Sequence, residues 1–123
     1  MKNIFISAGK IKLEAKLNNS KTAEKIWELL PIEGRANTWG NEIYFSIGEE
    51  IELEEDADEV VSMGDLAYWP TGEAFCIFFG TTPASQGDEI RAASPVNIFG
   101  RIIDDPESLK QVQSGTNITV QKK

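Results

Sequence analysis

The side chains best suited to binding a ligand are aromatic, and five of the eleven aromatic residues lie between Gly64 and Pro83. Two apolar runs of this stretch, 66–69 and 74–79, flank a turn-forming Pro-Thr-Gly segment and predict neighbouring strands. Aromatic walls with a few polar groups are what a cleft for an extended peptide or a small apolar ligand needs. The candidate substrate-binding residues are Glu42, Tyr44, Tyr68, Trp69, Phe75 and Ile77, with Arg35 at the rim.

The same aromatic residues have a structural interpretation. Both apolar runs are almost continuous, which is typical of strands that are covered on two faces. Trp69 and Phe75 would then fill a core instead of walling a cleft. Exposure of the Trp69 side chain distinguishes the two interpretations, because a fully buried residue cannot line a cleft.

Few residues of the chain could do acid–base or nucleophilic chemistry. Histidine is absent, which removes the commonest metal ligand and every Ser–His or Cys–His nucleophile. The single cysteine, Cys76, lies inside an apolar run and is interpreted as a small buried hydrophobic residue. The sequence therefore indicates no metal site and no cofactor.

Eight acidic residues crowd the segment 49–59, and the rest of the chain balances at twelve acids against twelve bases. The net charge of −8 is therefore local to this segment. Ile51 and Leu53 alternate with glutamates, which predicts a strand with one acidic face. A solvated acidic surface is the simplest interpretation. A calcium site is the alternative, although the glycine and the spacing of an EF-hand loop are missing.

Charge and hydropathy also bear on partners. The acidic excess and the lack of a basic stripe argue against a nucleic acid. The apolar runs are too short to span a bilayer and the N-terminus lacks a signal-peptide pattern, so we expect no membrane partner and a cytoplasmic location. A peptide or small-molecule ligand is the expected partner, in a monomer or a homodimer.

The remaining sequence predicts the elements that would position these residues. Clean alternation over 10–17 and over 42–47 predicts strands with one polar face. A helical period over 21–30, capped by Ser20 or Thr22, predicts a helix, and Asp105-Pro106 is a typical start for a second. Further strands are expected over 3–8, 96–103 and 116–120, and polar loops over 33–41 and 84–95.

Several stretches resemble the cyclophilins and follow in cyclophilin order. The strand 10–17, followed by Lys-Thr-Ala-Glu at 21–24, resembles the cyclophilin opening. The chain is more similar to the short prokaryotic cyclophilin-like proteins, whose recognisable stretches resemble 39–45, 64–70, 77–83 and 94–97. The resemblance implies a mainly β fold, a closed eight-stranded antiparallel cyclophilin-like barrel capped by two short helices, with residues 1–123 as a single domain.

For function, the resemblance implies a choice between binding and catalysis. True cyclophilins are peptidyl-prolyl cis-trans isomerases whose outer barrel face carries an arginine and a histidine. The strand most like their arginine strand, 42–45, has no arginine, and the histidine is missing. Arg35, reaching over from its loop, is the one candidate catalytic residue. We expect a cyclophilin-like protein that binds a ligand, with a peptidyl-prolyl isomerase of weak or altered activity as the alternative.

Overall fold

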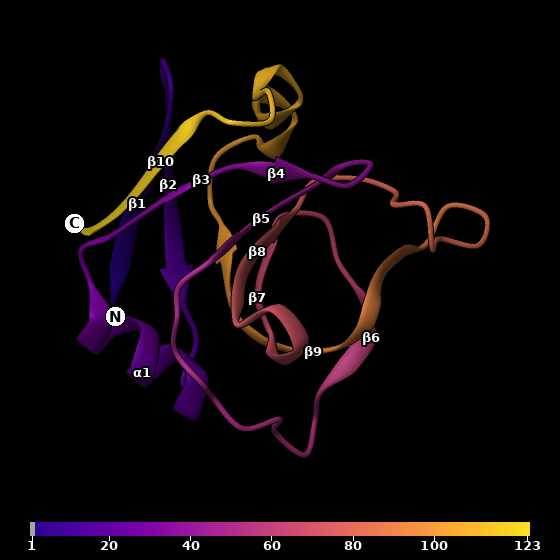
Figure 1. The fold of residues 1–123 in the computed structure, drawn as a ribbon, viewed down its shortest axis with the longest axis horizontal. Helices are drawn as coiled ribbons and strands as arrows, with labels where there is room; N and C mark the ends of the chain where they lie inside the picture. Colours follow the sequence, from indigo (N-terminus) through magenta and orange to yellow (C-terminus); the bar gives the residue numbers. More distant parts are fainter. Residues whose placement is uncertain (1) are drawn as a thin grey trace.

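The structure is a computed structural model that describes residues 2–123, and strands dominate it (Figure 1). The strands are β1 (Asn3–Ala8), β2 (Ile11–Leu17), β3 (Ile32–Arg35), β4 (Asn37–Thr38), β5 (Glu42–Ser46), β6 (Asp58–Val61), β7 (Asp65–Trp69), β8 (Ala74–Phe78), β9 (Ile90–Ile102) and β10 (Asn117–Lys122). The helical elements are α1 (Lys21–Leu29) and two short 3₁₀ helices, η1 (Pro70–Gly72) and η2 (Pro106–Gln111). The predicted class, mainly β with two short helices, is confirmed, with η2 in place of the second helix.

The strands form one rolled antiparallel sheet in the order β3-β10-β1-β2-β9-β7-β8-β5-β4, with β6 paired to β9. This differs from the closed eight-stranded barrel that the resemblance implied, because there are ten strands and, within residues 2–123, hydrogen bonds do not close the sheet. Ala36 joins the two end strands along the chain. Across the gap the Phe45 ring packs onto Gly34, where a Cβ atom would lie only 2.6 Å from the ring. Side-chain packing therefore completes the roll.

Local sequence explains the elements at the N-terminal side of the roll. In β2 the alternation buries Leu13, Ala15 and Leu17 and leaves the lysines toward water. The hydroxyl of Ser20 caps α1 by accepting a hydrogen bond from the Ala23 backbone N–H at 3.0 Å. These elements match their predicted positions.

The interior of the roll is filled by one hydrophobic core. At its centre the Phe75 ring stacks on Phe45 and meets Phe99 edge-on, with ring centroids 5.0 Å apart in both pairs. Ile26 of α1 and Leu109 of η2 enter the same core. Figure 1 shows α1 and the yellow η2 turn at opposite ends of the roll, so each end is covered by a helical element.

Three segments differ from the sequence-based prediction. The expected loop 33–41 contains most of β3 and all of β4, and the expected loop 84–95 contains the start of β9. Residues 50–54, in the acidic segment, are not a strand. Their backbone bonds side chains instead of a neighbouring strand, since the Tyr68 hydroxyl accepts from the Ile51 N–H at 3.1 Å and the Asn97 side chain accepts from the Glu54 N–H at 2.8 Å.

A second buried cluster lies on the outer face of β7 and β8, under β6 and the start of β9. Its members are Val61, Ala67, Ala74, Cys76, Phe78, Ile90, Ala92 and Val96. These two strands are therefore covered on both faces, as their continuous apolar runs predicted. Cys76 is fully buried in this cluster, which confirms its interpretation as a small hydrophobic residue.

Candidate functional site

A groove of about 210 Å³ lies beside this second cluster, on the outer face of the sheet. We call it the aromatic groove, and its lining residues are Trp39, Glu42, Tyr44, Trp69, Ala92, Ala93 and Val96. The period of two along β5 brings Glu42 and Tyr44 to this face, while Ile43 and Phe45 point into the core. Tyr44 and Trp69 approach each other across β8, because Tyr44 is paired with Cys76 and Trp69 with Ala74.

The Trp69 ring is held in place by three neighbours. Its indole Nε1 donates a hydrogen bond to the Ser94 hydroxyl at 2.7 Å, and the Tyr44 ring meets it edge-on at a centroid distance of 6.2 Å. Gly72 lies against the ring, where a Cβ atom would come within 2.8 Å of it. The side chain is only partly buried, so it can present surface to a ligand as a cleft wall must.

Trp39 reaches the groove from the loop between β4 and β5. The backbone N–H of Trp39 donates to the Glu42 carbonyl at 2.9 Å, and the Glu42 N–H donates back to the Trp39 carbonyl at 3.2 Å. Gly40 has a φ of +61°, and a Cβ atom there would lie 2.9 Å from the Thr82 backbone. Glycine is therefore required at this turn, which docks the loop firmly against the 81–83 segment.

Glu42 is the charged member of the groove lining and is only 6% exposed. Burial raises the pKa of its carboxyl group to about 7, against a smaller lowering by the Cys76 thiol. Within residues 2–123, no lysine or arginine forms an ion pair with it. The groove thus holds a carboxyl group that changes protonation state near neutral pH.

Three of the predicted binding residues lie elsewhere. Tyr68, Phe75 and Ile77 are fully buried in the interior core, so their prediction as cleft residues is corrected. The physical reason is strand alternation, because Tyr68 and Trp69 are consecutive and must point to opposite faces. Arg35, the candidate catalytic residue, is exposed at the end of β3, is not part of the groove lining, and donates to the Gly115 carbonyl at 3.4 Å.

Of the residues that the sequence predicts for a cleft, Glu42, Tyr44 and Trp69 line this groove, and the other four lining residues were not among the predicted ones. Trp39 lies in the segment taken as a polar loop, and its only signal was a large aromatic side chain among polar residues. Ala92, Ala93 and Val96 have no chemical signal of their own. They line the groove because β9 begins earlier than the apolar pattern indicates.

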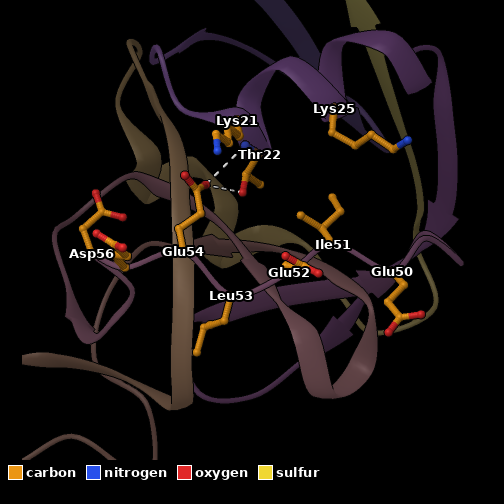
Figure 2. A pocket seen from close by; sticks show the side chains of 10 residues that line it. Lys21, Thr22, Lys25, Glu50, Ile51, Glu52, Leu53, Glu54 and Asp56 are labelled. Carbon is orange, nitrogen blue, oxygen red and sulfur yellow. Dashed lines mark hydrogen bonds between the residues drawn. The ribbon is translucent and has the colours of Figure 1, made fainter.

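A larger hollow, of about 630 Å³, lies between α1 and the acidic segment (Figure 2). Figure 2 shows Glu54 turned toward Thr22, and its carboxylate accepts hydrogen bonds from the Thr22 backbone N–H and hydroxyl. The other labelled acids and lysines are spread around the hollow. No three carboxylate or thiol groups gather closely enough to hold a metal ion in the part of the chain that the structure describes. The hydrogen bonds of this hollow tie the acidic segment to α1.

Comparisons with known proteins agree with this architecture. Residues 2–121 match a family model described as cyclophilin-like. Among solved structures, the chain is similar to the solution structure of the hypothetical protein AF2241 from Archaeoglobus fulgidus, at 38% sequence identity and a TM-score of 0.83. The similarity covers 99% of this chain and 95% of that one. No curated protein matches the chain. Over residues 2–123, no helix has the length and apolar character needed to cross a membrane.

Proposed function

This chain belongs to the cyclophilin-like family, and we propose that it works as a binding protein whose ligand site is the aromatic groove. The groove would take a small apolar molecule, or one apolar side chain of an extended peptide. The observation that supports this is the partly exposed Trp69 ring, fixed by Ser94 and Tyr44 at the side of a concave surface. Fixed aromatic walls lose little conformational entropy when a ligand binds.

The size of the groove limits what it could accept. A volume of about 210 Å³ is below the range of roughly 300–1,000 Å³ that is typical of drug-sized ligands. A single side chain or a small molecule therefore fits this space better than a folded segment does. Two of the lining residues, Ala92 and Ala93, are small and leave this space open.

A titration with 2-phenylethanol, followed by amide chemical shifts, tests the binding site. We expect saturable shifts that centre on residues 39–44, 69 and 92–96, and at least a tenfold weaker affinity in Trp69→Ala, since loss of one aromatic wall is worth about 1.4 kcal/mol or more. Trp27→Ala is the matched control. Trp27 is a residue of α1 that packs against the interior core, and it is not part of the groove lining.

A second variant tests the same site without removing a large side chain. Ala93→Phe should fill the groove and block binding, because Ala93 is an exposed member of its lining. Shifts that map to the hollow beside α1, or equal affinities in the wild type and both groove variants, would contradict the proposal. Thermal melting of each variant separates lost binding from lost folding.

Isomerase activity is the alternative that the groove favours less. Amide rotation has a barrier of about 20 kcal/mol, and a hydrogen-bond donor near the proline nitrogen lowers it. None of the seven lining residues is an arginine, and Arg35 lies outside the groove. In a protease-coupled assay we expect the protein to leave the isomerisation rate at its value in buffer. Acceleration that disappears in Arg35→Ala would show that the protein is an isomerase after all.

A further inference from the structure

We propose that the aromatic groove selects an organic ammonium ion, a small protonated amine with an apolar body, and binds its nitrogen at the Glu42 carboxylate. This inference rests on the proposed function, because it assumes that the groove binds a ligand. It adds the chemical class of that ligand and the residue that recognises it.

The position of Glu42 is the first argument. A glutamate that is only 6% exposed is normally paired with a cation or several donors, because burying an unpaired charge is unfavourable. The described lysines and arginines form no ion pair with Glu42, yet its side chain lines the groove. A cation entering the groove would therefore meet a carboxylate that has no competing protein cation.

The surrounding rings are the second argument. Trp39, Tyr44 and Trp69 line the same groove as Glu42, and the Tyr44 and Trp69 rings are perpendicular within 10°, at an interplanar angle of 80°. Aromatic faces attract ammonium groups through the ring quadrupole, and aromatic cages with a nearby carboxylate suit alkylated ammonium ions. The apolar residues Ala92 and Val96 would contact the hydrocarbon part of the same ligand.

The other charged and titratable groups of this outer face do not compete for the cation. Asp65, on β7, already pairs with Arg101 at 3.2 Å. Burial raises the pKa of the Cys76 thiol well above its usual range, so it stays neutral beside Glu42. Tyr44 is the remaining titratable group of the lining, and the groove residues on β9 carry no charge. Glu42 is therefore the one anionic centre that the lining offers.

Other ligand classes fit less well. An anion would be repelled by the Glu42 carboxylate and by the net charge of −8, which instead raises the local concentration of cations. A divalent metal needs several oxygen ligands, and within residues 2–123 no group of three suitable side chains is present. A neutral apolar molecule would leave the carboxylate without a cationic partner and so would favour its protonated form.

Two ligands with the same phenyl-ethyl body test the proposal, 2-phenylethylammonium and the neutral 2-phenylethanol. At pH 8, where an alkylamine is still protonated and Glu42 is ionised, we expect the amine to bind wild-type protein at least tenfold more tightly by calorimetry. In Glu42→Gln the preference for the amine over the alcohol should disappear, because the two ligands then meet the same neutral side chain. Glu50→Gln, in the exposed acidic segment, is the control for long-range charge and should keep the preference.

The outcomes separate this inference from the proposed function. If neither ligand binds, the groove is not a binding site and both proposals fail. If both bind equally and Glu42→Gln changes nothing, the groove binds ligands but the ammonium inference is wrong. Nα-acetyl-lysine N-methylamide represents a lysine side chain of a protein. If it bound more tightly than 2-phenylethylammonium, the proposal of a small free amine as the ligand would be overturned. A loss of affinity for the amine as the pH falls from 8 to 5.5, with no such loss for the alcohol, would support the role of the carboxylate.

Discussion

Phe75→Ala is expected to lower the free energy of unfolding by about 3–5 kcal/mol, as is usual for loss of a fully buried aromatic side chain. Phe75 has no exposed surface, and its ring contacts both Phe45 and Phe99 at the centre of the roll. Phe45 in turn packs on Gly34 across the gap between the two end strands, which no strand pairing among the described residues closes. The substitution would therefore leave a cavity and weaken the packing that completes the roll. Urea unfolding followed by tryptophan fluorescence measures the change.

Phe5→Ala is the matched control for this cavity effect. Phe5 lies on β1 on the face away from the core, is partly exposed, and has the Lys12 ammonium 4.4 Å from its ring centroid. Its removal should cost about 1 kcal/mol or less, because little packed volume is lost. If Phe75→Ala and Phe5→Ala had equal, small effects, Phe75 would lie at the surface, and its prediction as a cleft residue would have to be restored.

The aromatic stretch shows how far sequence reasoning reaches. Two covered strands joined by a turn could be predicted from the continuous apolar runs and from Pro-Thr-Gly, and both strands are present. The same continuity hid which side chains share a face, since a run that is apolar at every position has no visible period. The alternation of β5 is clear, and Glu42 and Tyr44 lie on its outer face. Which residues of β8 share that outer face follows only when the pairing of β5 with β8 is known.

The strand predicted around Ile51 and Leu53 in the acidic segment is absent for a different reason. Its alternation of Ile51 and Leu53 with glutamates satisfies the strand pattern, but a strand also needs a partner. In the structure the partners are side chains, because Asn97 and Tyr68 bind the backbone of this segment. Both side chains come from distant positions in the sequence, so a local pattern carries no information about them.

The missed strands are explained by their place in the sheet. β3 and β4 are its two end strands, and all four residues at 33, 35, 37 and 38 are polar. A strand that buries little apolar surface has a weak period, and hydrogen bonding to its neighbour determines its structure. Trp39 directly follows these strands and was not predicted as a groove residue, although the loop after β4 carries it into the groove.

Glu42 should make the unliganded protein less stable as the pH rises. The folded-state pKa is about 7, against an ordinary value of 4.5, so between these values the folded state binds more protons than the unfolded state. The stabilisation from the neutral carboxyl group is complete below pH 4.5, declines from there to about pH 7 and is absent above it. At about 1.4 kcal/mol per pH unit, the full loss is on the order of 3 kcal/mol.

Glu42→Gln removes the ionisable group and keeps a side chain of similar shape. The difference in the free energy of unfolding between variant and wild type therefore isolates the contribution of Glu42 from that of the other carboxyl groups. We expect equal free energies of unfolding near pH 4.5 and a variant more stable by about 2–3 kcal/mol at pH 8, measured by urea unfolding at each pH. Glu50→Gln, which changes an exposed carboxylate, should differ from wild type by about 0.5 kcal/mol or less at every pH. A stability difference for Glu42→Gln that stays constant between pH 4.5 and 8 would show that the carboxyl group ionises normally. The groove would then lack the desolvated anion on which its preference for an ammonium ion depends.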